Sequence, residues 1–178
     1  MTFHRLSRLL ATILLIGLFV FGLATTAAAD PPTREPVDFP TDPFVLTDTR
    51  GNHPCGFRVE LAVLENKEVA TTFVRKDGTT SIHITGSLKV RLTNLDAPGT
   101  TVELNISGPT HLTEHDDGSV TQIALGRALW TFDPGIAPDL PRLALISGRT
   151  VSVFDAAERF SLISVSGHVE DLCAVLAA

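Results

Sequence analysis

The sequence predicts an all-β domain, and three observations lead to this class. Apolar and polar residues alternate along several segments, turn-forming pairs such as Asp77-Gly78 and Asp117-Gly118 separate these segments, and no stretch of helical periodicity lies between them. We expect a single antiparallel barrel of about eight strands, closed or nearly closed, with a short C-terminal helix. A β-sandwich of two sheets is the alternative.

Residues 1–29 have the three parts of a secretory signal peptide. A basic start at residues 4–8 precedes an apolar run from Leu9 to Leu23, and Ala27–Ala29 supply small residues before a cut at Asp30. The apolar run is too short to cross the roughly 30 Å hydrocarbon core of a bilayer. We therefore expect cleavage, a secreted, extracellular mature chain, and no stable membrane span.

Residues 30–54 form a proline-rich segment that we interpret as an extended lead-in to a domain over residues 55–178. Proline removes a backbone hydrogen-bond donor and opposes both helix interiors and central strands. The apolar residues Phe39, Phe44, Val45 and Leu46 suit docking onto the domain, and a peptide-like binding epitope is the alternative.

The first strands of the domain are expected over residues 57–64 and over Val69–Arg75. The clearest alternation follows, from Ser81 to Asn94, and predicts one long strand with a single wet face. Gly86 lies in the middle of this strand and predicts a sharp bend or bulge, the device that lets a strand curl round a barrel.

The alternation continues in shorter segments toward the C-terminus. Strands are expected over Thr101–Ser107, Val120–Phe132, Leu143–Ile146, Thr150–Phe154 and Phe160–Val165. Gly126 marks a further bend. The tail Val169–Leu176 has apolar residues at helical spacing, which predicts a short closing helix.

Cys55 and Cys173 are the only two cysteines. Export exposes both to oxidising conditions, so one disulfide between the start of the domain and its last helix is expected. The alternative is a thiol nucleophile or a redox pair, but the two residues do not form a C-x-x-C motif.

Four residues are candidate ligand-binding residues. His83, Lys89 and Arg91 share one face of the long strand, which is either a polar pocket with a possible general base or the ordinary wet side of a sheet. Trp130 could stack against a ligand, although large aromatic residues of β proteins more often belong to the core.

His115, Asp116 and Asp117 are the candidate metal ligands. They follow His111 in a short acidic stretch whose carboxylates suit calcium. The stretch lacks the regular D-x-D-x-D-G pattern, and an ordinary solvated turn is the alternative.

Composition and motifs exclude several functions. A net charge of −6 argues against nonspecific nucleic-acid binding, which needs clustered Lys and Arg. No G-x-S-x-G elbow, phosphate-binding loop, H-E-x-x-H motif or dinucleotide fingerprint is present, so no cofactor is expected.

The runs CGFRVELAVLENKEVATTF, ITGSLKVRLTNLDAPG and SVSGHVEDLCAVLAA are similar to uncharacterised secreted hypothetical proteins of high-GC Gram-positive (actinobacterial) bacteria. This resemblance covers about Cys55 to Ala178, includes both cysteines, and carries over no catalytic residue. A likeness in plan alone connects the expected barrel with the eight-stranded barrels of allene oxide cyclase and dirigent proteins.

These expectations define two functional hypotheses. The first is a binding or envelope-interaction module whose partner is an apolar small molecule or a cell-envelope component. The alternative is a small barrel enzyme of the allene-oxide-cyclase or dirigent kind, acting on an apolar small molecule.

Overall fold

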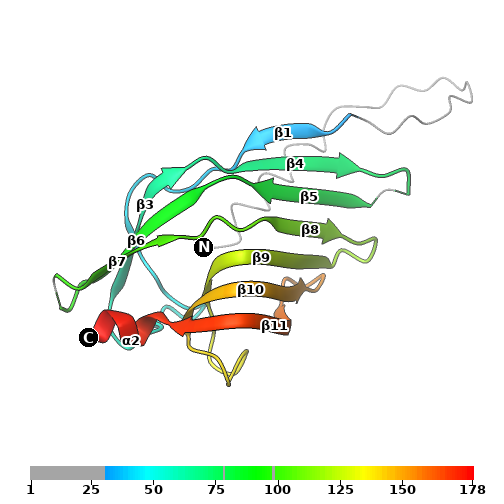
Figure 1. Ribbon diagram of the computed structural model, residues 1–178. Coiled ribbons are helices and arrows are strands. Elements are labelled where there is room, and N and C mark those ends of the chain that lie inside the picture. The colour runs from blue at the N-terminus through cyan, green and yellow to red at the C-terminus, as the bar shows by residue number, and fades with distance from the viewer. Residues whose placement is uncertain (1–30, 78, 98) are drawn as a thin grey trace, which may run out of the picture.

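Antiparallel strands form two sheets (Figure 1). The computed structural model describes residues 31–77, 79–97 and 99–178, so the predicted signal peptide lies outside the described residues. The sheets have the strand orders β1-β4-β5-β8-β9-β10-β11 and β2-β3-β6-β7. The all-β prediction is therefore confirmed. The closed barrel is not confirmed, because the strands divide between two sheets, and a sandwich-like arrangement is consistent with that division.

The elements have the following bounds. The seven-stranded sheet consists of β1 (Thr33–Pro36), β4 (Val69–Val74), β5 (Thr80–Thr85), β8 (Thr110–Glu114), β9 (Val120–Thr131), β10 (Leu143–Phe154) and β11 (Phe160–Asp171). The four-stranded sheet consists of β2 (Phe44–Val45), β3 (Val59–Asn66), β6 (Leu88–Asn94) and β7 (Thr101–Asn105). Helix α2 (Leu172–Ala177) follows β11 directly and overlaps the expected helical tail, whose first residues, 169–171, belong to β11.

The long strand expected from Ser81 to Asn94 is two strands in two different sheets. β5 ends and β6 begins around Gly86, so the predicted bend is confirmed and the single continuous strand is corrected. Gly86 has a φ of 139°, and a Cβ there would lie 2.2 Å from the Lys67 carbonyl oxygen. A side chain is therefore excluded at the point where the chain changes sheets.

Two short strands expected over Leu143–Ile146 and Thr150–Phe154 are one strand, β10. The residues between them stay in register, with Gly148 opposite Gly126 of β9 and opposite Gly167 of β11. Because hydrogen-bonded neighbours lie on both sides, the ladder continues through a position that looked like a break in the sequence.

Glycines in register form a row across four adjacent strands: Gly108, just before β8, and Gly126, Gly148 and Gly167. At Gly148 a Cβ would lie 1.9 Å from the Ser166 carbonyl oxygen. Only glycine tolerates this approach of neighbouring backbones. We call these four residues the glycine row.

Strands β9 to β11 bend sharply along the glycine row. Trp130 is paired near one end of β10 and Phe160 is paired at the other, ends that would lie about 35 Å apart in a straight strand. The two ring centroids are nevertheless 6.1 Å apart. The strands therefore fold toward the side that carries these rings. We call this side the inner face of the seven-stranded sheet, and the opposite side its outer face.

Apolar residues fill the inside of the bend. The cluster comprises Trp130, Phe132, Ala137, Leu140, Ala144, Ile146, Phe160, Leu162, Val165 and Val169. Part of it comes from residues 132–142, the connection between β9 and β10, which covers the inner face near Trp130.

The larger core lies between the four-stranded sheet, the ends of β9 and β10, and helix α2. Its fully buried members include Val59, Leu92, Leu143, Leu172 and Leu176. The alternation read from the sequence supplies this core from β3, β6 and β7, because successive side chains of a strand point to opposite faces.

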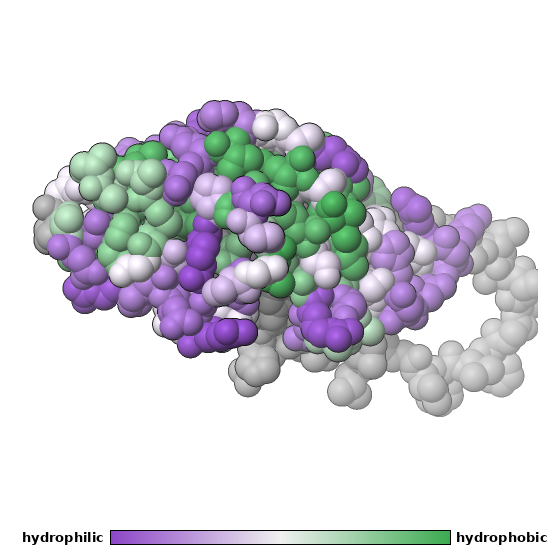
Figure 2. Space-filling view, turned by 90° about the horizontal axis from the view of Figure 1, so that it is seen from below, coloured by the Kyte–Doolittle hydropathy of each residue, from purple (hydrophilic) through white to green (hydrophobic). Residues whose placement is uncertain are grey.

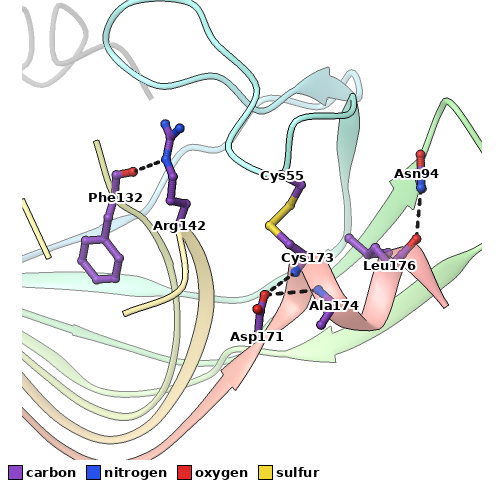
Figure 3. The surroundings of a disulfide bond; sticks show 8 residues. All are labelled: Cys55, Asn94, Phe132, Arg142, Asp171, Cys173, Ala174 and Leu176. Atoms are coloured by element: carbon purple, nitrogen blue, oxygen red, sulfur yellow. Dashed lines mark hydrogen bonds between the residues drawn. A yellow bond between two sulfur atoms is a disulfide. The ribbon is translucent and has the colours of Figure 1, made fainter. Parts of the chain in front are cut away.

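The predicted disulfide is confirmed, and it ties the start of β3 to helix α2 (Figure 3). Cys55 and Cys173 have Cα atoms 5.1 Å apart and enclose a sequence separation of 118 residues. The Asp171 carboxylate caps the helix by accepting hydrogen bonds from the backbone N–H groups of Cys173 and Ala174. At the other end, the Asn94 side chain donates to the Leu176 carbonyl.

The segment predicted as a lead-in belongs to the folded domain. It contributes β1 to one sheet and β2 to the other, and Phe39, Phe44 and Leu46 pack into the larger core. Docking, rather than a free epitope, therefore describes these residues, although Val45 is exposed.

The Asp48 carboxylate connects this segment to the rest of the domain through hydrogen bonds and an ion pair with Arg142. Burial, the largest effect, raises its pKa, but hydrogen bonds from Asn52, Arg142 and the Arg50 backbone together lower the pKa to about 2. Arg142 donates to Asp48 and also to the Phe132 carbonyl, the contact drawn in Figure 3. The carboxylate therefore joins residues 46–52 to the start of β10.

Candidate functional site

The structure separates the ligand-binding residues predicted on the long strand. Lys89 and Arg91 lie on the exposed side of the four-stranded sheet, where they pair with Glu65 at 3.2 Å and Glu103 at 2.6 Å. His83 lies in the other sheet. One polar pocket containing all three residues is therefore excluded, because the break at Gly86 directs the two halves of the strand into different sheets.

His83 is part of a ring cluster on the outer face. Its imidazole lies 4.3 Å from the ring of His111 on β8 and 4.9 Å from the ring of Phe73 on β4, measured between centroids. The register places His83 between Thr71 and His111, so three neighbouring strands build the cluster.

A hollow of about 630 Å³ opens beside this cluster, at the ends of β4 and β5. Its lining consists of Pro31, Pro32, Phe73, Val74, Arg75, Lys76, Ser81 and His83. Two side chains of this lining are cationic, one is an imidazole, and four residues present apolar surface. No acidic side chain belongs to this lining. We call it the β4–β5 hollow.

The electrostatics of the hollow favour a neutral imidazole and a positive rim. Burial, His111 and Arg75 lower the pKa of His83, in that order, so His83 is uncharged at neutral pH. Asp77 follows Lys76 in the turn, and its pKa is lowered first by hydrogen bonds from Thr79 and then by the charge of Arg75. Asp77 offsets part of that charge, and Lys76 adds a second cation.

Trp130 lies in the apolar cluster of the inner face, away from His83. Its ring stacks on Phe132 with centroids 5.9 Å apart and an interplanar angle of 5°. Its indole Nε1 is buried and has no hydrogen-bond partner among the described residues. These contacts are those of a core residue, and a ligand role for Trp130 stays a prediction.

The candidate metal ligands lie in the turn between β8 and β9. The Asp117 carboxylate accepts hydrogen bonds from the backbone and hydroxyl of Ser119, and the His115 imidazole contacts the Thr121 hydroxyl at 2.9 Å. Within the described ranges, no group of three or more His, Cys, Asp or Glu residues is arranged to hold a metal ion. A metal site at His115, Asp116 and Asp117 therefore stays a prediction without geometric support.

A second, smaller hollow of about 260 Å³ lies between residues 137–140 and β11. Figure 2 shows this side of the molecule, with hydrophobic residues gathered in its middle. Ile163, which is 61% exposed, lines this hollow. The lining holds a single charged residue, Asp139, so it offers little chemistry to select a ligand.

Sequence reasoning identified His83 but missed Phe73, Arg75 and Ser81. The Asp77-Gly78 turn contained a signal for them, because a hairpin register places Phe73 opposite Ser81 and Thr71 opposite His83. His111 could also be found by register. Lys89 pairs with Asn105 in β6 and β7, and the same register continued across the break pairs His83 with His111.

Comparisons with known proteins leave the site to be judged on its geometry. No family model, curated protein or solved structure matches the chain. No helix within residues 31–178, as far as they are described, has the length and apolar character needed to cross a membrane.

Proposed function

We propose that this chain is a secreted, disulfide-closed binding module, and that the β4–β5 hollow receives a ligand with an anionic group and an apolar or planar body. The single observation that carries this proposal is the composition of the hollow. Arg75 and Lys76 supply positive charge, Phe73 and the two prolines supply apolar surface, and no acidic residue lines it.

The charges favour an anionic group over a cationic one. A carboxylate, phosphate or sulfate gains charge-assisted hydrogen bonds from guanidinium and ammonium groups. His83 adds a neutral imidazole to the same lining. The ring N–H of this imidazole can donate a hydrogen bond to the anionic group of the ligand. A cationic ligand would instead meet two like charges.

Secretion is supported by the disulfide, because such bonds persist in oxidising compartments. The signal peptide predicted over residues 1–29 would supply the export route. An envelope component or a free molecule outside the cell would then be the natural ligand class.

Benzoate provides a direct test, because it combines a carboxylate with a planar ring. We expect benzoate to shift the NMR signals of the His83 ring, with a dissociation constant in the millimolar range suited to an open hollow. Benzamide, which has nearly the same shape without the charge, should shift these signals much less. Arg75→Gln combined with Lys76→Gln should weaken benzoate binding about fivefold, which corresponds to about 0.5 kcal/mol from each of two exposed charge pairs.

Lys89→Gln is the matched control, because Lys89 is an exposed cation that lies away from the hollow. It should bind benzoate as the unmodified protein does. Equal shifts from benzoate and benzamide, or no shift of the His83 signals with benzoate, would refute the proposal.

A further inference from the structure

The outer face of the seven-stranded sheet carries basic residues on six of its seven strands. Register and alternation place Arg34, His83, His111, Arg127, Arg149 and His168 at outer-face positions of β1, β5, β8, β9, β10 and β11, and the hollow opens on the same face. Arg34, Thr71, His83 and His111 follow one another in a direct cross-strand row.

Acidic residues of this sheet are placed elsewhere. Among its described strands, Glu35, Glu114 and Asp171 occupy inner-face positions, and Glu170 alone occupies an outer-face position, next to helix α2. Other acids, such as Asp77 and Asp155, lie in the turns at the strand ends. The strands of the seven-stranded sheet therefore place their arginines and histidines on the outer face and most of their carboxylates on the inner face.

The three arginines of this face are available to a partner. Arg34, Arg127 and Arg149 are exposed, and none of them forms an ion pair with another described residue. Arg58, Arg91, Arg142 and Arg159, in contrast, all pair with carboxylates.

The size of this face indicates an extended partner. From β1 to β10 the basic positions extend over about 24 Å at the roughly 4.8 Å strand spacing of a sheet. A single small anion contacts only one end of such a row, so a ligand that uses the whole row must carry several charges along its length.

We propose that the natural ligand is an acidic polysaccharide, which lies across the outer face from Arg34 to Arg149 and places one end in the β4–β5 hollow. This proposal rests on the binding function proposed above and names its ligand class. We call the residues Arg34, His83, His111 and Arg149 the basic row.

Hydroxyl groups and charge density favour a polysaccharide over a nucleic acid. Thr71, Thr113, Thr121, Ser164 and Ser166 share the outer face with the basic row. Such side chains donate to and accept from sugar hydroxyls. A nucleic acid carries a charge about every 3.4 Å per strand, which the sparse arginines of this face do not match. A polymer with one charge per sugar or fewer fits their spacing better.

Polygalacturonate, a polymer with one carboxylate per sugar, tests the proposal. We expect the full exported protein to bind it in isothermal titration calorimetry, and binding should weaken about tenfold when salt rises from about 50 to about 200 mM. Arg34→Gln and Arg149→Gln should each weaken binding about three- to fivefold, as expected for one exposed charge pair. Dextran, a neutral polysaccharide, should not bind.

Arg91→Gln is the control for lost positive charge, because Arg91 lies on the other sheet, and it should leave polygalacturonate binding unchanged. If Arg34→Gln and Arg149→Gln bind polygalacturonate as tightly as the unmodified protein does, the basic row is not its site. Tighter binding of single-stranded poly(dT) than of polygalacturonate would overturn the ligand class.

The two proposals fail in distinguishable ways. Loss of polygalacturonate binding only in the Arg75→Gln, Lys76→Gln variant would retain the hollow and reject the row. Loss in Arg34→Gln and Arg149→Gln, together with no effect of benzoate on His83, would retain the row and reject the hollow. Circular dichroism spectra identical to that of the unmodified protein would confirm that each variant is folded.

Discussion

At the residue scale, the carboxyl group of Glu68 is buried beside Gly86, where the chain passes from one sheet to the other. Glu68 lies between β3 and β4, only 7% exposed, and a Cβ on Gly86 would approach its Cα within 2.6 Å. Burial raises the pKa of this carboxyl. A buried carboxylate is unfavourable, so folding makes the Glu68 carboxyl harder to ionise than it is in the unfolded chain.

This raised pKa makes the folded state less stable as pH rises. The unfolded chain releases the Glu68 proton near the ordinary value of 4.5, whereas the folded chain holds it to higher pH. The free energy of unfolding therefore falls as pH rises from about 4.5 through the folded pKa. We expect Glu68→Gln to stabilise the protein at pH 7 by about 1 kcal/mol, the size typical of single substitutions.

Urea unfolding at two pH values measures this effect. At a pH of about 3.5 the carboxyl is neutral in both states, so the gain from Glu68→Gln should disappear. Glu35→Gln, which changes an exposed carboxylate of β1, is the control and should change stability little at either pH. A gain of the same size at both pH values would contradict the role of charge.

At the element scale, the glycine row decides the shape of β9, β10 and β11. These three strands stay paired along their length, with one register shift against β11 between Val151 and Ser152, and they bend enough to bring Trp130 and Phe160 into ring contact. The bend gives the inner face its own apolar cluster, whereas the outer-face positions hold apolar side chains such as Ile123, Leu125 and Val151 beside hydroxyl and basic ones. Backbone approach at the glycines, more than side-chain packing, permits this geometry.

Two alanine substitutions distinguish the effect of close approach between strands from the effect of a positive φ. Gly148→Ala would place a methyl group 1.9 Å from the Ser166 carbonyl oxygen, so we expect a loss of about 3 kcal/mol in the free energy of unfolding. Gly126→Ala meets its nearest atom at 3.5 Å, but the residue has a φ of 78°. The strain of that φ alone should cost about 1–2 kcal/mol.

Urea denaturation of the two variants tests the comparison. The larger loss should fall on Gly148→Ala, although Gly126 has the rarer backbone conformation. Equal losses, or a larger loss for Gly126→Ala, would show that close approach of the strands does not govern the bend.

The boundaries of strands could be predicted from the sequence only where a turn pair or a clear alternation marks them. The Asp77-Gly78 turn predicted the β4–β5 hairpin, and the alternation predicted β3, β6 and β7. β10 was divided wrongly at Gly148, because a glycine in a strand reads locally as an end. The contact of His83 with His111 was also missed, because the β6–β7 register continues into β5 and β8 only across the change of sheets, which local periodicity does not show.

At the scale of the whole molecule, the disulfide closes the domain around the larger core. Cys55 lies just before β3, and Cys173 lies in helix α2, which covers that core. Closing a separation of 118 residues restricts the unfolded chain strongly. The sheets and the helix are thereby held in one unit.

Removing the disulfide should lower stability without changing the fold. We expect the double variant Cys55→Ser, Cys173→Ser to lose about 2–5 kcal/mol in the free energy of unfolding, measured by urea denaturation. Reducing the unmodified protein should produce a loss of the same size. Two reactive thiols in the folded, oxidised protein, or an unchanged denaturation midpoint, would contradict this expectation.

By itself, the sequence determined what depends on local order along the chain. Alternation determined the all-β class, and the Asp77-Gly78 pair determined the β4–β5 hairpin. The two cysteines determined the Cys55–Cys173 disulfide. Each of these features depends on the chemistry of one short segment or of one residue pair. The tertiary structure alone decided how the strands divide between two sheets, where they bend, and which side chains meet. His83 lies beside Phe73 and His111, and not on one face with Lys89 and Arg91 as the alternation predicted. The reason is that contacts between distant segments determine strand pairing and the change of sheets at Gly86, and periodicity does not encode such contacts.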